Sequence, residues 1–399
     1  GTEDPKIFNP ARFDAHQWAA TAKDAGFKGI ILTAKHHDGF CLWPTAQTEH
    51  CLRNSPWRDG KGDVVREVAD ACRAAGLKFG FYLSPWDRNS PKYEDGKAYD
   101  DYFAAQLEEL LTGYGPVSEV WFDGAGSEGH VYDWQRYYAA IRRHQPGAVI
   151  AICGPDVRWV GNEDGVARET EWSVRDADAA TGPGQDGKAW HPAECDVSIR
   201  PGWFWHQSQD GQVKSLARLL DIYYKSVGRN AGLLLNVPPT SEGRFAAPDA
   251  ARLREFRLAL DATFATDLAR GKPCRADAVR GGDPGFGPAR AVDGDPRTYW
   301  AVDDDVRQAS IEIDLEAPAA CSVCLLGEAI ELGQRIEAHR VEVLAGGQWR
   351  TVARGTTVGY KRLHRFPAVE ALRITNPPWG MASWSAANVS ASMKLTLVS

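Results

Sequence analysis

The first 264 residues alternate short apolar runs with amphipathic stretches, and this alternation restricts the fold more than any other feature. The apolar runs are residues 29–33, 79–83, 119–122 and 149–152, with weaker runs at 171–174, 202–205 and 233–237. Apolar residues at helical spacing occupy residues 14–25, 63–75, 99–114, 133–143, 213–227 and 250–267. Strands that alternate with helices form a parallel sheet wrapped by helices. The pattern predicts an α/β fold, a (β/α)8-like barrel over residues 1–268.

This barrel is one strand short. The sequence offers seven strand candidates, whereas a (β/α)8 barrel needs about eight. Before Gly29 we expect one helix, near Phe13 to Ala25, and no strand ahead of it. We therefore expect the first strand to belong to sequence that is absent from this chain. The chain opens at Gly1 without a Met, so we expect it to be processed or cut, with any targeting segment already gone.

The pattern changes after about Gly271. Helical periodicity ends, and short alternating segments follow at residues 310–315, 340–344, 349–353 and 371–374. Such segments predict an antiparallel β-sandwich over residues 269–399, joined by a link rich in Gly, Pro, Arg and Asp at 270–288. Asp293 to Asp295 could hold a structural Ca²⁺ through hard oxygen ligands.

Composition excludes several classes of protein. The formal net charge of -7 gives no reason to expect a nucleic-acid partner. No apolar stretch approaches the roughly 18 residues of a membrane span. Most of the eight cysteines lie in apolar or strand-like runs, and the Cys321–Cys324 spacing lacks a second pair, so we expect neither zinc nor another cofactor. The oligomeric state stays open.

Asp123 follows the apolar run 119–122 and precedes Gly124. The run indicates a short buried strand that ends in a glycine turn. An Asp at the carboxyl tip of a parallel strand lies at the mouth of the barrel, where such folds carry their chemistry. Taken alone, Asp123 could equally cap the strand beside a turn.

Three further clusters fall at or after strand ends. His36 and His37, followed by Asp38, could ligate a metal, hydrogen-bond a polyol or form a structural pair. Residues 82–89 combine an aromatic ring with polar groups, and residues 158–172 offer several carboxylates in a Gly-containing loop. Two carboxylates among many aromatic side chains suggest glycoside hydrolysis, in which a separation of about 5–5.5 Å leads to retention and a wider one to inversion.

Fifteen tryptophans are a high count for this length. Core packing explains some of them, and flat platforms for sugar rings would explain those in loops. The loop tryptophans are Trp57, Trp86, Trp203, Trp205, Trp379 and Trp384.

Together these motifs resemble the α-L-fucosidases of glycoside hydrolase family 29, over nearly the whole chain. The motifs that carry the resemblance are residues 33–40, 54–57, 82–89, 121–124, 159–163, 199–206 and 233–239. The Ser-Pro-Trp-Asp-Arg-Asn segment at 84–89 and the Gly-Asn-Glu segment at 161–163 are most similar to the subfamily that cleaves α-1,3 and α-1,4 fucosyl linkages on branched, Lewis-type glycans.

The resemblance implies a role for each candidate residue. Asp123 would be the nucleophile and Glu163 the general acid/base of a retaining double displacement, with Glu169 and Glu171 as alternatives to Glu163. The residues implied in substrate binding are His36, His37, Trp43, Trp86, Glu194, Trp203 and Trp205. Within this set the histidines would hold fucose hydroxyls, Trp86, Trp203 and Trp205 would form apolar walls, and Glu194 with Asp196 would contact a branching galactose.

By the same resemblance no metal is needed and the partner is a fucosylated oligosaccharide or glycoconjugate. The second domain resembles a discoidin-like, galactose-binding-type sandwich, with a structural or a sugar-binding role. Because fucosylated glycans lie outside cells, we expect secretion or periplasmic export. Two rival functions remain, a glycan-binding pseudo-enzyme with an incomplete barrel and a His-Asp metal hydrolase.

Overall fold

A computed structural model describes residues 1–182, 187–376 and 392–398. Its first half contains a parallel four-stranded sheet in the order β1-β2-β3-β4. These strands are β1 (Gly29–Lys35), β2 (Lys78–Leu83), β3 (Glu119–Phe122) and β4 (Val149–Ile152). All four coincide with the stronger apolar runs, which confirms that part of the prediction.

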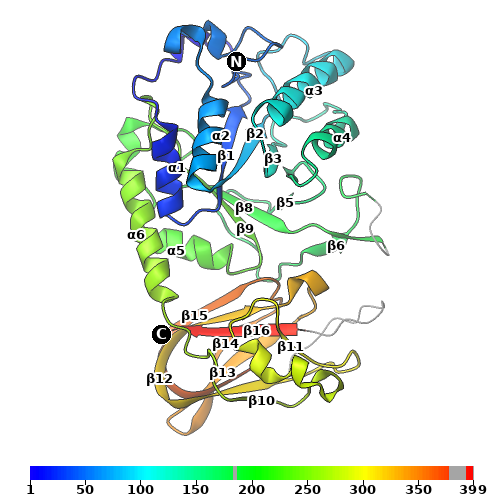
Figure 1. Cartoon of the computed structure of the whole chain (residues 1–399), viewed down its shortest axis with the longest axis vertical. Helices are drawn as coiled ribbons and strands as arrows, with labels where there is room; N and C mark the ends of the chain where they lie inside the picture. Colours follow the sequence, from blue (N-terminus) through cyan, green and yellow to red (C-terminus); the bar gives the residue numbers. More distant parts are fainter. Residues whose placement is uncertain (183–186, 377–391, 399) are drawn as a thin grey trace.

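Helices that precede each of these strands cover the outside of the sheet (Figure 1). They are α1 (Ala15–Asp24), α2 (Val64–Ala75), α3 (Gly96–Gly113) and α4 (Trp134–His144). In α2, the carboxylate of Asp63 caps the first turn by accepting from the Arg66 N–H, and Gly76 ends the helix at φ 71°. Its apolar face, with Val65, Val68 and Cys72, is fully buried.

Three more parallel strands follow, in the order β5-β8-β9. They are β5 (Arg158–Trp159), β8 (Ala193–Ser198) and β9 (Gly232–Asn236), and the helices α5 (Leu216–Lys225) and α6 (Ala247–Thr263) lie outside them. A parallel bridge between Ala151 and Val157 links β4 to the start of β5. Within the described residues β1 pairs only with β2, and β9 only with β8, so the strands form a barrel-like arrangement that is not closed between β1 and β9.

Two of the weaker strand predictions were wrong. Residues 171–173 form no strand, and β6 (Val174–Asp176) instead pairs antiparallel with β7 (Lys188–Trp190) in a hairpin. Residues 202–205 form a bend, because Pro201 precedes Gly202 at φ 70°. The strands β5 and β8 take their places among the seven parallel strands.

The second half is an antiparallel sheet of seven strands, in the order β11-β16-β12-β15-β13-β14 with β10 beside β12. The strands are β10 (Cys274–Ala276), β11 (Trp300–Ala301), β12 (Ile311–Gly327), β13 (His339–Ala345), β14 (Gln348–Gly355), β15 (Arg362–Asn376) and β16 (Ser392–Val398). Alternate residues of β13 are buried, including Val341 and Val343. Each of the four alternating segments predicted from the sequence falls within one of these strands, apart from Ser310, which comes just before β12.

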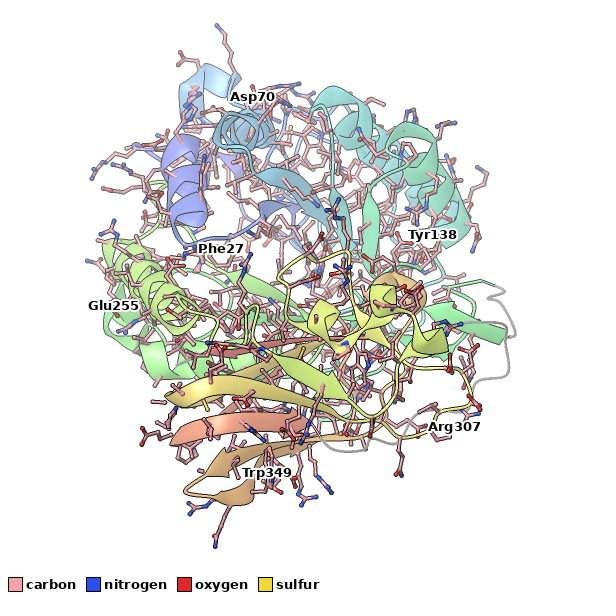
Figure 2. All side chains as sticks on the ribbon, turned by 60° about the horizontal axis from the view of Figure 1, so that its bottom comes forward. Phe27, Asp70, Tyr138, Glu255, Arg307 and Trp349 are labelled. Atoms are coloured by element: carbon pink, nitrogen blue, oxygen red, sulfur yellow. The ribbon has the colours of Figure 1, made fainter. Side chains whose placement is uncertain are left out.

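Apolar and polar contacts join the two halves. Leu363 of β15 packs with Tyr223 and Tyr224 of α5, and the Arg365 guanidinium lies 5.1 Å from the Tyr224 ring centre. Figure 2 shows Glu255 of α6 and Tyr138 of α4 on opposite sides of the first half. It shows Trp349 at the end of the second half that lies away from the first half. No helix in the described ranges is long and apolar enough to cross a membrane.

Candidate active site

Asp123 is the first residue after β3, at the carboxyl end of the parallel strands. Its Oδ2 accepts a hydrogen bond from the Tyr82 hydroxyl at 2.8 Å, and its Oδ1 accepts the Ala125 N–H at 2.8 Å. The side chain keeps 23% of its surface exposed, so an incoming molecule can reach it. A carboxylate held through both oxygens at a strand tip is oriented for reaction.

His36 and His37 form one wall beside Asp123. The His36 ring stacks on Tyr82, with 5.6 Å between ring centres and 7° between planes. Nε2 of His37 lies 3.6 Å from Asp123 Oδ2, and its Nδ1 lies 2.7 Å from the Ser84 hydroxyl. Burial lowers the pKa of both histidines, that of His36 to about 4, so both rings are neutral near pH 7.

The hydrogen bonds of Ser84 determine which nitrogen of His37 carries the proton. The Ser84 hydroxyl donates to the Trp86 carbonyl at 2.7 Å, so it must accept from His37 Nδ1–H. The Nε2 of His37 is then an acceptor next to the Asp123 carboxylate. Two neighbouring acceptors call for hydroxyl donors, which a sugar supplies.

Trp86 continues this wall. The centre of the Trp86 ring lies 4.9 Å from that of the His37 ring. The Arg88 guanidinium lies 5.7 Å from the centre of the Trp86 ring. A Cβ added at Gly126 would meet the Trp86 ring at 2.0 Å, so the indole lies directly against the turn that follows Asp123. The predicted residues Asp123, His36, His37 and Trp86 thus converge.

Glu163 projects from the loop after β5. Asn162 closes a tight turn there, since its Oδ1 accepts the Asp164 N–H at 3.1 Å and its Nδ2 donates to the Val166 carbonyl at 2.8 Å. Glu163 is exposed, and its Oε2 accepts the indole N–H of Trp203 at 3.3 Å. Glu163 and Trp203, which were predicted separately as acid/base and apolar wall, are thus in contact, while their roles stay predictions.

The two alternatives to Glu163 are occupied elsewhere. Glu171 is buried and ion-paired with Arg158. Glu169 is ion-paired with Arg229 and, at 2.8 Å, with Arg362 of β15. Both carboxylates are neutralised by arginines near the contact between the two halves of the protein, which leaves Glu163 as the one of the three candidate glutamates without an arginine partner among the described residues.

Asp196 is a third acidic residue of the site, and the sequence reasoning gave it only a minor role. It lies on β8, is 6% exposed, and its Oδ1 accepts the Trp159 indole N–H at 2.7 Å. Burial raises its pKa, and the negative charges of Glu163 and Asp123 raise it further. The buried Asp196 carboxyl therefore lies within electrostatic reach of both candidate reacting carboxyls, Asp123 and Glu163. The alternation of polar residues 194, 196 and 198 along an inward-facing strand was the available signal.

Two of the predicted substrate-binding residues, Trp43 and Glu194, are engaged in indole hydrogen bonds. Trp43 is 1% exposed and donates its indole N–H to Glu109 at 2.8 Å, so it packs in the core and cannot contact a sugar. Glu194 accepts from the Trp121 indole at 2.9 Å, beneath the Trp121–Tyr82 stack, two residues deeper along β8 than Asp196. Trp43 is therefore too deeply buried to contact substrate as predicted, whereas Glu194 is partly exposed and its contact with substrate stays a prediction.

The other loop tryptophans lie in different surroundings, and the wall role of Trp205 stays a prediction. Trp57 is buried in the core. The indole N–H of Trp205 is directed at Asp210, 3.3 Å away, within its own loop. Trp379 and Trp384 lie outside the described residues. Phe204 was not expected to form a wall of the site. It is 58% exposed and contacts His36 edge-on, with 5.3 Å between the ring centres.

Within the described ranges, no group of three or more His, Cys, Asp or Glu side chains is arranged to hold a metal ion. The His36–His37 pair is instead engaged by Tyr82 and Ser84. The arrangement as a whole offers two carboxyls, the pair of groups that most glycoside hydrolysis uses, beside a neutral imidazole acceptor and aromatic walls suited to a sugar.

Comparisons with known proteins agree with this chemistry. A family model described as alpha-L-fucosidase matches residues 3–258, and one described as a NedA-like, galactose-binding domain matches residues 290–375. The rice protein "Putative alpha-L-fucosidase 1" is 46% identical over 385 residues, which cover 92% of this chain and 74% of the relative.

Two solved structures extend the similarity. A putative alpha-L-fucosidase from Bacteroides thetaiotaomicron has a TM-score of 0.91 and 37% identity, and the match covers 100% of this chain and 90% of the other. A family 29 fucosidase from Ruminococcus gnavus in complex with fucose has a TM-score of 0.90 and 33% identity, covering 100% of this chain and 88% of the other.

Proposed function

Because the chain belongs to the α-L-fucosidase family and is therefore a glycoside hydrolase, we propose that it releases L-fucose with retention of configuration, from α-1,3 and α-1,4 linkages of branched glycans. In this proposal Asp123 is the nucleophile and Glu163 the general acid/base. One observation carries it: buried Asp196, on the inward face of β8, lies close enough to Asp123 and to Glu163 for both negative charges to raise its pKa, which supports the two carboxyls acting on one substrate.

The proposed reaction has two steps. In the first, the Asp123 carboxylate attacks the anomeric carbon while Glu163 gives its proton to the leaving oxygen, so the glycosidic bond breaks and a fucosyl ester forms. In the second, Glu163 removes a proton from water, which attacks the same carbon and frees Asp123 and L-fucose. The Tyr82 hydroxyl and the Ala125 N–H hold the attacking carboxylate in place.

The neutral His37 side chain supports sugar binding at this position. Its Nε2 can accept from a fucose hydroxyl next to Asp123, while Trp86 provides an apolar face beside it. The linkage preference rests on the segments 84–89 and 161–163, which are similar to those of the subfamily specific for α-1,3 and α-1,4 bonds. A glycan-binding protein without turnover is not favoured, since both reacting carboxyls are present.

The test uses a Lewis-type trisaccharide alongside a disaccharide with an α-1,2 linkage. We expect fucose release from the first to be much faster, with α-L-fucose as the first anomer seen by NMR. Azide should accelerate a Glu163→Ala variant on an aryl fucoside and give the α-azide, because azide replaces water in the second step. Undiminished turnover by Asp123→Ala, or β-L-fucose as first product, would refute the proposal.

A further inference from the structure

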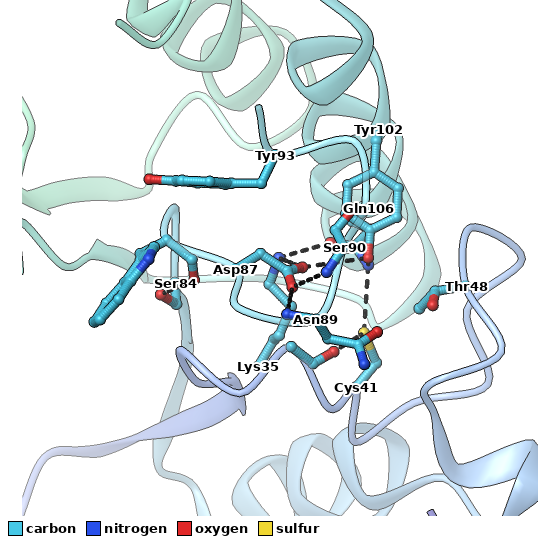
Figure 3. A network of polar contacts seen from close by, with 12 residues as sticks. Lys35, Cys41, Thr48, Ser84, Asp87, Asn89, Ser90, Tyr93, Tyr102 and Gln106 are labelled. Carbon is cyan, nitrogen blue, oxygen red and sulfur yellow. Dashed lines mark hydrogen bonds and ion pairs between the residues drawn. The ribbon is translucent and has the colours of Figure 1, made fainter. Parts of the chain in front are cut away.

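Behind the His37–Trp86 wall lies an ion pair that has no contact with solvent. Lys35 ends β1, and its Nζ lies 3.1 Å from Asp87 Oδ2 and 3.0 Å from Gln106 Oε1 of α3 (Figure 3). The side chains of Lys35 and Asp87 are both 0% exposed. The same ammonium lies 5.2 Å from the centre of the Phe103 ring. A fully buried charge pair is thus built between two strand-end loops and a helix.

Asp87 holds the shape of its own loop and touches the other one. Its Oδ1 accepts the N–H groups of Asn89 at 3.0 Å and Ser90 at 2.8 Å (Figure 3). A Cβ added at Gly39, where φ is 78°, would meet this same oxygen at 2.4 Å. The carboxylate therefore fixes the 84–90 loop and packs directly against the turn after His37.

Backbone contacts complete the junction of the two loops. The Ser84 N–H donates to the Lys35 carbonyl at 2.9 Å, and the Arg88 N–H donates to the His37 carbonyl at 2.9 Å. His37 and Trp86, which face the site, project from the two segments that the ion pair joins. A change in the pair would therefore shift both side chains together.

Stability alone is a weak reason for such a pair. Removing two charges from water costs about as much as their attraction returns, and apolar replacements of buried pairs are often neutral. Geometry is what the pair supplies here, because the ammonium and carboxylate each bind several fixed partners. Neither Lys35 nor Asp87 contacts Asp123 or Glu163 among the described residues. We therefore expect a change in the ion pair to affect sugar binding more than bond cleavage.

We propose that Lys35 and Asp87 are positioning residues for fucose binding, and that their buried ion pair sets the position of the His37–Trp86 wall. This inference rests on the proposed placement of the sugar against His37 and Trp86. The pair acts through the two loops and does not touch the substrate.

The experiment uses the full chain carrying Lys35→Met with Asp87→Asn, which removes both charges and keeps an acceptor for the Asn89 and Ser90 N–H groups. We expect KM for 4-nitrophenyl α-L-fucoside and the inhibition constant of L-fucose to rise together about tenfold, with kcat changed less than about threefold. Gln106→Leu, which removes one acceptor of Lys35 and no charge, is a milder variant with an expected rise of about threefold.

Partial unfolding would give a different result, since a smaller active fraction lowers the apparent kcat and leaves KM unchanged. A lowered apparent kcat with an unchanged KM, in both the double variant and Gln106→Leu, would overturn the inference. A matched control is Glu328→Gln in the second half, which alters a buried carboxylate bound to the N–H groups of Arg335, Ile336 and Gly359. Its KM should not change.

His37→Ala, measured in parallel, separates this inference from the proposed function. If His37→Ala weakens fucose inhibition and the Lys35 and Gln106 variants do not, the positioning role is refuted while the sugar placement stands. If His37→Ala leaves fucose inhibition unchanged, the sugar placement itself is wrong, and the inference falls with it.

Discussion

The barrel interior contains a pair of glutamates whose ionisation should weaken the fold as the pH rises. Glu119 begins β3 and shares the inward face of that strand with Trp121. Its Oε1 is buried and has no hydrogen-bond partner among the described residues. Burial, and then the charge of Glu194, raises its pKa to about 8, while burial raises the pKa of Glu194 to about 7.

The sign follows from proton binding. Between the ordinary value of 4.5 and about 8, folded Glu119 keeps a proton that the unfolded chain has lost. Unfolding then releases that proton, so the free energy of unfolding falls by about 1.4 kcal/mol per pH unit. Over the whole interval one independent group would contribute about 5 kcal/mol, and because the two carboxyls titrate as a pair, we expect about 2–3 kcal/mol from Glu119.

Glu119→Gln keeps the shape of the side chain and cannot ionise. We therefore expect the variant to gain about 2–3 kcal/mol of unfolding free energy relative to the unchanged protein between pH 5 and pH 8. Urea unfolding at pH 5, 6, 7 and 8, followed through the barrel transition, measures this difference. Burial also raises the pKa of Glu328, to about 7, but both proteins contain Glu328. Its contribution to the pH dependence of stability therefore cancels in the difference between them.

The matched control is Glu94→Gln at an exposed glutamate, for which the stability difference should not depend on pH. Parallel pH profiles of the Glu119→Gln variant and the unchanged protein would refute the reasoning, because they would mean that the Glu119 carboxyl ionises equally easily in the folded and unfolded states.

Three other substitutions give distinct outcomes. Tyr82→Phe removes the hydroxyl that holds Asp123 and should lower kcat for an aryl fucoside about 10- to 100-fold with little change in melting temperature; unchanged kcat would contradict the orienting role. Trp43→Phe should leave KM unchanged and lower the free energy of unfolding by about 1–2 kcal/mol, since the side chain packs in the core; a raised KM would show that it contacts sugar after all. The Arg200 Nε lies 2.8 Å from Asp249 Oδ2, and both side chains are 0% exposed. Arg200→Met leaves the buried Asp249 carboxylate uncompensated and should cost about 3–5 kcal/mol in urea unfolding; a smaller loss would mean that Asp249 takes up a proton instead.

The sequence predicted the strands whose apolar runs are uninterrupted, and it failed where polar residues face inward. β8 carries Glu194, Asp196 and Ser198 toward the barrel interior, so its pattern is like that of a half-exposed segment. Residues 202–205 are aromatic enough to suggest a strand, but Gly202 at φ 70° turns the chain. Inward polar groups and local turns depend on neighbours that a single segment does not reveal.

The sequence was also sufficient to place some residues of the candidate site and insufficient for others. Asp123 could be placed at a strand end because an apolar run and a glycine flank it, and the structure confirms that position, while its role as nucleophile stays a prediction. Trp43 could not be assigned correctly, because only the fold reveals that Glu109 of α3 accepts its indole N–H. Composition identifies aromatic residues, but burial decides whether they meet solvent.

The loop that carries Glu163 continues directly into the contact with the second half. Eight residues after Glu163, the N–H of Glu171 donates to the Thr357 hydroxyl at 3.0 Å, and the carbonyl of Glu169 accepts from Arg362 at 2.8 Å. If Glu163 is the acid/base as proposed, the loop that carries it is restrained by the second half of the protein. Truncating the chain after α6 would therefore yield a looser enzyme, and swapping the second half for another module would require the replacement to reproduce these anchor points.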